Sequence, residues 1–212
     1  AYYLEKGEGG KIAAVHYRSS NGEDTRLSAN AFIVAAHGLE TPKLLLMSDV
    51  ANSSDQVGRN LMDHTGIGLQ FLADEPLWPG RGQVQQGGIF NWRDGEFRRE
   101  HSAIKHALTN MVPNSKVTQR LLDNLIVGPE LDERIRHDSA RFVDVSTVFQ
   151  MLPPAHNTVR PSRKHKDALG IPTLTVDYSV DDYVKAAGHV AKQDFANFVR
   201  IMNGTVIEND KG

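Results

Sequence analysis

The residues best placed for chemistry lie where a short apolar run meets the start of a helix. Residues 31–36 form this run, and their β-branched members favour a strand that is buried on both faces. Thr41 can cap a helix and Pro42 suits its first position, where no amide donor is needed. Such a unit presents backbone donors at the carboxyl edge of a strand, where doubly wound folds bind ligands. The residues expected to contact a ligand through backbone atoms are Ala36, His37 and Gly38.

The elements before this stretch form a hairpin that leads into it. Residues 11–18 alternate between apolar and polar side chains, and residues 25–29 return as a second strand after an Asn21-Gly22 turn. Strand-turn-helix units are also common in α/β proteins that bind nothing at this point. The pattern alone therefore leaves a purely structural role open.

From Thr65 onward the pattern changes to a succession of strands. The predicted strands are residues 68–73, 83–92, 96–99 and 103–108. An Asp94-Gly95 pair between alternating segments predicts a hairpin turn. We place a domain boundary near Thr65, which divides the chain into residues 1–64 and 65–212.

The remainder of the chain adds helices to this sheet. Apolar residues at helical spacing predict a helix over 117–127 and a second, short one around Leu131 and Ile135. Residues 142–151 alternate as a half-buried strand, with 174–178 as its neighbour. A helix that starts at 179–182 carries one apolar stripe: Val184, Ala187, Ala191, Phe195, Phe198 and Met202. The predicted fold class is α+β, an antiparallel sheet with helices on one face plus a hairpin-strand-helix piece of an α/β domain.

Other residues are weaker candidates for a catalytic, metal-binding or sugar-binding role. Asp63 could orient His64 for proton transfer, although a structural hydrogen-bonded pair explains the two equally simply. His101 and His106 are five residues apart and would point to opposite faces of a strand, so we expect no joint metal site. Aromatic residues that could line a sugar pocket are Phe149, Tyr178 and Tyr183, although aromatic residues in strands are more often core residues or cross-strand pairs. We assign no catalytic residue and no metal ligand within the chain.

Composition excludes several classes of function. The net charge of −2 argues against a nucleic-acid partner, and no apolar run is long enough for insertion into a membrane. The chain has no cysteine, which excludes disulfides and thiolate chemistry.

Two motifs identify a family. Residues 35–48 read AAHGLETPKLLLMS and residues 57–64 read VGRNLMDH. Together they closely resemble the middle of the glucose-methanol-choline (GMC) oxidoreductases. The sequence of the first motif is most similar to the bacterial gluconate, fructose and sorbitol dehydrogenase branch of that family. A third segment, residues 152–183, resembles part of the substrate domain of that family.

The resemblance implies FAD as cofactor and a sugar, polyol or sugar acid as substrate. In the family, a histidine near the carboxyl end takes the alcohol proton while hydride moves to the flavin. The resemblance assigns residues 1–64 to the last part of the FAD-binding domain and 65–212 to most of the substrate-binding domain. It places Ala36, His37 and Gly38 at the adenine and ribose end of FAD. An electron-transfer subunit as partner and a periplasmic location are expectations from the family only.

The chain carries neither the Gly-x-Gly-x-x-Gly phosphate loop of the family nor its catalytic histidine motif. We therefore expect an internal fragment that is catalytically inactive by itself. Two alternatives stay open. The chain could be a non-catalytic domain that binds sugar or docks a partner, or it could belong to an oxidase that passes electrons to oxygen.

Overall fold

The computed structural model describes residues 1–209, and these contain four α-helices and three antiparallel sheets. Contacts divide the chain into two compact units. The first unit joins Ala1–Asp63 with Leu152–Ser179, and the second joins His64–Met151 with the residues from Val180 onward. This division differs from the predicted one, because Leu152–Ser179 packs with the first unit and not with the residues around it in sequence. The roles that the sequence suggested for the two parts of the chain remain predictions.

The first unit begins with a three-stranded meander. Its strands are β1 (Tyr3–Lys6), β2 (Ile12–Arg18) and β3 (Asp24–Leu27), paired in the order β1-β2-β3, with a single 3₁₀ turn over Glu8–Gly10. The predicted hairpin is thus confirmed, although its connection spans residues 19–23 and not two residues. Leu4 and Ala14 provide the buried side chains.

The strand predicted over residues 31–36 does not form. This segment has no regular secondary structure, and Ile33 is 93% exposed. A strand is stable only beside hydrogen-bonded neighbours, and no strand within residues 1–209 pairs with this one. The hairpin-strand-helix piece of the predicted fold is therefore a hairpin and a helix joined by an irregular segment.

Helix α1 (His37–Met47) and a two-stranded ribbon complete the first unit. The ribbon consists of β8 (Thr158–Lys166) and β9 (Pro172–Asp177), which pair with each other. The prediction that residues 174–178 lie beside 142–151 was wrong, because the short connection between the two ribbon strands makes them partners. Helix α1 contacts β8 and β1, and the Leu4 amide donates to Ser48 Oγ at 2.8 Å just after the helix.

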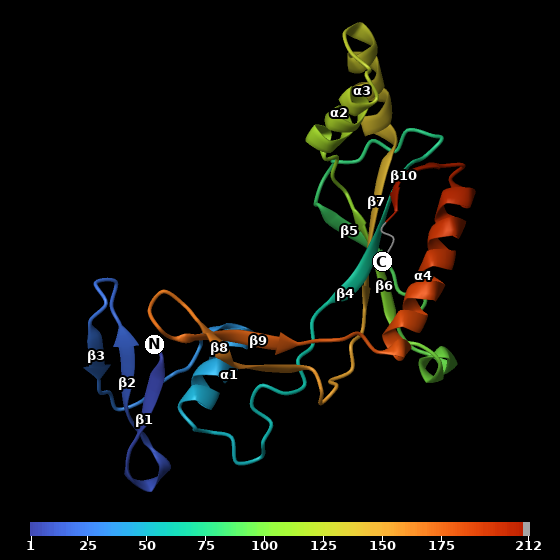
Figure 1. Ribbon diagram of the computed structural model, residues 1–212. Helices are drawn as coiled ribbons and strands as arrows, with labels where there is room; N and C mark the ends of the chain where they lie inside the picture. The colour runs from blue at the N-terminus through green and yellow to red at the C-terminus, as the bar shows by residue number, and fades with distance from the viewer. Residues whose placement is uncertain (210–212) are drawn as a thin grey trace. The chain divides into compact units, whose positions relative to one another are not determined.

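The second unit is built on a five-stranded antiparallel sheet in the order β10-β4-β7-β6-β5 (Figure 1). The strands are β4 (Thr65–Leu72), β5 (Gln85–Ile89), β6 (Ile104–Thr109), β7 (Phe142–Phe149) and β10 (Thr205–Asn209). The strand predicted over Glu96–Arg99 is instead one 3₁₀ turn. Gly95 precedes it with φ 148°, so Asp94-Gly95 leads into this turn and not into a hairpin.

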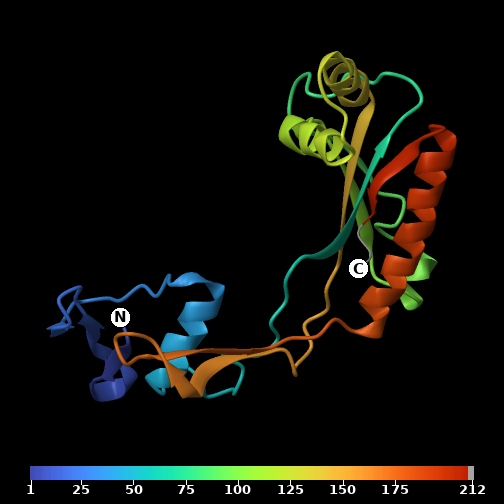
Figure 2. The same cartoon turned by 45° about the horizontal axis from the view of Figure 1, so that its top comes forward.

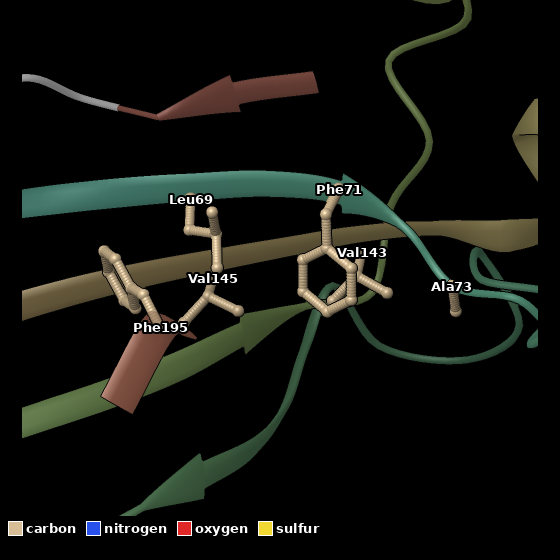
Figure 3. Packing of buried hydrophobic residues seen from close by; sticks show 6 residues of the cluster. All are labelled: Leu69, Phe71, Ala73, Val143, Val145 and Phe195. Atoms are coloured by element: carbon tan, nitrogen blue, oxygen red, sulfur yellow. The ribbon is translucent and has the colours of Figure 1, made fainter. Parts of the chain in front are cut away.

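Helix α4 (Asp182–Ile201) runs along one face of this sheet, as two views agree (Figures 1 and 2). Its predicted apolar stripe is confirmed and packs on side chains from β4, β6 and β7. Figure 3 shows one part of this core, made by Leu69, Phe71, Ala73, Val143, Val145 and Phe195. The N-cap is Asp181, whose carboxylate accepts from the Val184 amide at 3.0 Å.

Helices α2 (Asn114–Asp123) and α3 (Pro129–Arg141) pack against each other at one end of the sheet. Val117 and Leu121 form a separate cluster with Phe142, the first residue of β7. The α+β class with antiparallel sheets is therefore confirmed. No helix among residues 1–209 is long and apolar enough to cross a membrane.

Candidate functional site

The site predicted from sequence lies at the start of α1. The helix begins at His37, so Thr41 and Pro42 lie inside it and are not the cap and first position that we predicted. Thr41 Oγ1 instead accepts from the Ala36 amide at 3.1 Å, across the first turn. This contact ties the end of the irregular segment to the helix. The sequence rule failed because the hydroxyl of Thr41 bonds backward and the helix extends before it.

His37 has an unusual backbone. Its φ of 73° is in the left-handed region, which costs a non-glycine residue about 1–2 kcal/mol. The ring partly compensates, because the Leu39 amide donates to His37 Nδ1 at 3.3 Å. The imidazole thus accepts a hydrogen bond from the first turn of its own helix, and residues 36–38 are exposed.

A cavity of about 520 Å³ opens beside this helix start. It lies within the first unit and brings together three segments that are far apart in sequence. Its lining residues are His37, Gly38, Leu39, Leu61, Met62, Asp63, Val176 and Tyr178. Each of the three family-like segments contributes to it, a convergence that the sequence alone did not indicate.

A close backbone contact explains the glycine of the second motif. Gly58 has φ 76°, and a Cβ there would lie 2.2 Å from the Val159 carbonyl oxygen. The close approach to β8 includes a hydrogen bond, since the Val159 amide donates to the Gly58 carbonyl at 2.7 Å. Glycine is therefore required at this position by geometry.

Asn157 fastens the third segment to the second. Its buried Nδ2 donates to the Leu61 and Ser179 carbonyls at 3.3 and 3.0 Å, and its Oδ1 accepts from the Ser179 amide at 2.9 Å. The Leu61 amide in turn donates to the Asn157 carbonyl at 3.0 Å. These bonds hold the wall of the cavity that Leu61 provides.

The other sequence candidates have different positions. Asp63 lines the cavity of the first unit, whereas His64 lines a hollow in the second. Tyr178 lines the first cavity, but Phe149 is buried under α4 and the Tyr183 hydroxyl donates to the Arg98 carbonyl at 3.0 Å. Phe149 is thus a core residue, which was the alternative reading for aromatic residues of strands, and a role of Tyr178 in binding sugar stays a prediction.

His106 belongs to a buried polar network that the sequence did not indicate. Its Nδ1 hydrogen-bonds Thr147 Oγ1 at 2.7 Å, and its Nε2 hydrogen-bonds Asp194 Oδ2 at 3.1 Å. Trp92 Nε1 donates to the same carboxylate oxygen at 2.7 Å. His101 lies before β6, with its ring stacked on Phe97 at 4.9 Å between centroids. Within residues 1–209, no cluster of three or more histidines and carboxylates could hold a metal ion.

Comparison with known proteins identifies the family of the chain. Residues 3–66 match the model of the GMC oxidoreductase family. Over 214 residues the chain is 40% identical to the fructose dehydrogenase large subunit of Gluconobacter japonicus. This alignment covers 98% of the chain and 39% of the relative, so the chain spans less than half the length of that protein. The chain belongs to the GMC oxidoreductase family.

Proposed function

We propose that this chain is part of an FAD-dependent oxidoreductase that oxidises an alcohol group of a sugar, polyol or sugar acid by hydride transfer to flavin. The observation that carries the proposal is the 40% identity to a fructose dehydrogenase subunit over 98% of the chain. The identity extends over both compact units. This favours a role for both units in the same enzyme. The proposal extends to a protein partner, because the relative is the large subunit of its enzyme.

The start of α1 fits one part of FAD. The first amides of a helix have no acceptor within the helix, and Gly38 has no heavy atom within 4 Å of the position of a Cβ. The adjoining cavity, about 520 Å³, lies in the range of about 300–1,000 Å³ that is typical of small-molecule sites. In this proposal the backbone of Ala36, His37 and Gly38 contacts the adenine and ribose end of the cofactor.

When bound, the flavin supplies the acceptor for the hydride that leaves the alcohol carbon. The contribution of this chain is positional. The first unit holds one end of the cofactor, and the sheet of the second unit supplies a wall for the substrate. Because the chain carries neither the phosphate loop nor the catalytic histidine motif, we expect it to be inactive by itself.

The complete protein, expressed from the surrounding reading frame and purified with FAD, tests the function. We expect flavin absorbance and reduction of an artificial dye with fructose, sorbitol or gluconate. A complete protein that neither binds flavin nor oxidises any of these compounds would refute the proposal. Hydrogen peroxide release would reassign it to the oxidases, and saturable sugar binding without flavin would favour a non-catalytic domain.

A variant of the complete protein tests the cofactor residues separately. Gly38→Leu places a side chain at the mouth of the cavity without a steric clash or a positive φ, so we expect weaker FAD binding in a folded protein. Gly188→Leu is the matched control, because it adds the same side chain to α4 where no heavy atom lies within 4 Å of the Cβ position. Equal FAD affinity for Gly38→Leu and the control would refute the assignment.

A further inference from the structure

The two-stranded ribbon of the first unit is irregular near its turn. Pro161 of β8 pairs with Leu174 of β9, and the next pair joins Lys166 to Pro172. Four residues of β8 therefore lie opposite one residue of β9, so residues 162–165 bulge out of the ribbon. We call residues 162–166, which read SRKHK, the basic bulge.

Hydrogen bonds hold the shape of the basic bulge. Ser162 Oγ accepts from the Lys164 and His165 amides at 3.2 and 3.0 Å, and Thr173 Oγ1 donates to the His165 carbonyl at 3.3 Å. In the turn that follows, Asp167 Oδ1 accepts from two backbone amides at 2.9 Å each. All of these bonds use hydroxyls, a carboxylate and backbone groups. The local fold therefore does not require the positive charges of the bulge.

The bulge exposes four basic side chains: Arg163, Lys164, His165 and Lys166. Among residues 1–209, none of these four side chains makes an ion pair or a hydrogen bond. The two carboxylates of the ribbon are engaged elsewhere, Asp167 with the turn and Asp177 with Arg160. Like charges that lie this close together repel one another. Since the chain as a whole has a net charge of −2, the cluster is a local feature and does not reflect a basic chain.

The basic bulge also stays on the outside of the longer protein that we propose. Some faces that are exposed in this chain are apolar, such as Ile33 at 93% exposure, and these suit contacts with the rest of that protein. Lysine and arginine side chains are almost never fully buried unless they are paired. The bulge therefore remains available to another molecule.

We infer that the basic bulge is a docking surface for an acidic face of a second protein subunit. This inference rests on the proposed function, which includes a protein partner, and it assigns the surface and the charge of the contact. Complementary charges speed the encounter of two proteins and fix their orientation. A membrane is a poorer occupant, because the bulge has no apolar side chain to insert and stable attachment to a bilayer takes a second signal besides basic residues.

The test uses the complete protein, coexpressed with the reading frames beside its own. The subunit that copurifies is separated, and its binding to the complete protein is followed by surface plasmon resonance. The bulge variant combines Arg163→Gln, Lys164→Gln and Lys166→Gln. We expect Kd to rise by about 3- to 100-fold, mainly through slower association, because three exposed ion pairs are lost. The difference from wild type should shrink between about 0.05 and 0.5 M salt as screening increases.

A control variant removes the same charge elsewhere. It combines Lys11→Gln, Arg93→Gln and Arg200→Gln, three exposed residues outside the ribbon. We expect its Kd to stay within about twofold of wild type, since long-range effects of net charge are screened at physiological salt.

The bulge variant should keep its fold and its basal chemistry. The bulge lies at the opposite end of β9 from Tyr178, about 20 Å along the strand, so it does not reach the cavity beside α1. Flavin absorbance, thermal unfolding and dye reduction should therefore equal those of wild type. Should the triple variant be unstable, Lys164→Glu reverses a single exposed charge and should also weaken binding.

The outcomes separate the inference from the function on which it rests. A flavin-bound, active protein with no copurifying subunit would overturn the inference and leave the proposed function standing. So would a Kd that is independent of salt or equal in the bulge and control variants. Binding to vesicles of phosphatidylcholine and phosphatidylglycerol that is lost in the bulge variant, with an unchanged Kd for the subunit, would assign the bulge to a membrane. A preparation without flavin and without activity would overturn the proposed function and the inference with it.

Discussion

The carboxylate of Asp194 joins α4 to the sheet, and its removal is the sharpest test of how the second unit is held together. Asp194 Oδ2 accepts from Trp92 Nε1 at 2.7 Å and is 3.1 Å from His106 Nε2. His106 is fully buried, and its other nitrogen bonds Thr147 of β7. One carboxylate thus connects α4, β6, β7 and the segment that contains Trp92.

The size of the effect follows from these contacts. A hydrogen bond to a charged group contributes about 1.5–3 kcal/mol, and Asp194→Ala removes two of them. The Asp194 side chain is 22% exposed, so water can replace part of what is lost. We expect the free energy of unfolding to fall by about 2–4 kcal/mol in Asp194→Ala. Asp194→Asn keeps an acceptor oxygen and should lose about half as much.

Urea unfolding followed by circular dichroism measures this change. A double-mutant cycle with Trp92→Phe isolates the contact to the indole, for which we expect a coupling energy of about 1 kcal/mol or more. Lys185→Ala on the same helix is the control, because its pair with Asp182 is exposed and should matter little. If Asp194→Ala and the control unfold at the same urea concentration, the network does not fasten α4 and the reasoning is wrong.

Three further outcomes follow from local geometry. Gly58→Ala should destabilise the first unit by at least about 2 kcal/mol in urea unfolding, because its Cβ would meet the Val159 carbonyl at 2.2 Å and φ is 76°. Phe71→Ala should cost about 3–5 kcal/mol in the same assay, since the ring is fully buried; an unchanged midpoint would contradict the packing. Hydrogen bonds from Arg26 and His16 lower the pKa of Glu5 to about 2. A depressed carboxylate pKa contributes stability above the unfolded value near 4.5 that is lost as pH falls through about 2, so the advantage of wild type over Glu5→Gln should vanish across that window in thermal unfolding. A constant difference from pH 6 to pH 2 would contradict this linkage.

Long periodic segments were readable from sequence. The apolar stripe on α4 and the alternation of β7 exist because one face of each element is buried. Each residue of such an element is apolar or polar according to its face, so the pattern has many independent members. The strand predicted over residues 31–36 was wrong. An apolar run indicates that a strand could be buried between neighbouring strands, but it does not show that such neighbouring strands are present. The strand predicted over Glu96–Arg99 was wrong because the Asp94-Gly95 pair is a turn signal that fits a 3₁₀ turn as well as a hairpin.

The sequence by itself determined the family and the α+β class, because these depend on local order and on motifs that are continuous in the chain. Only the tertiary structure decided which distant residues meet. It grouped Leu152–Ser179 with the first unit, placed Asp194 against His106 across 88 residues, and made Gly68 and Ala107 the register partners of Ser146 on either side of β7. The physical reason is that pairing register and helix docking are set by the packing of whole elements, and no single segment of the sequence carries that information.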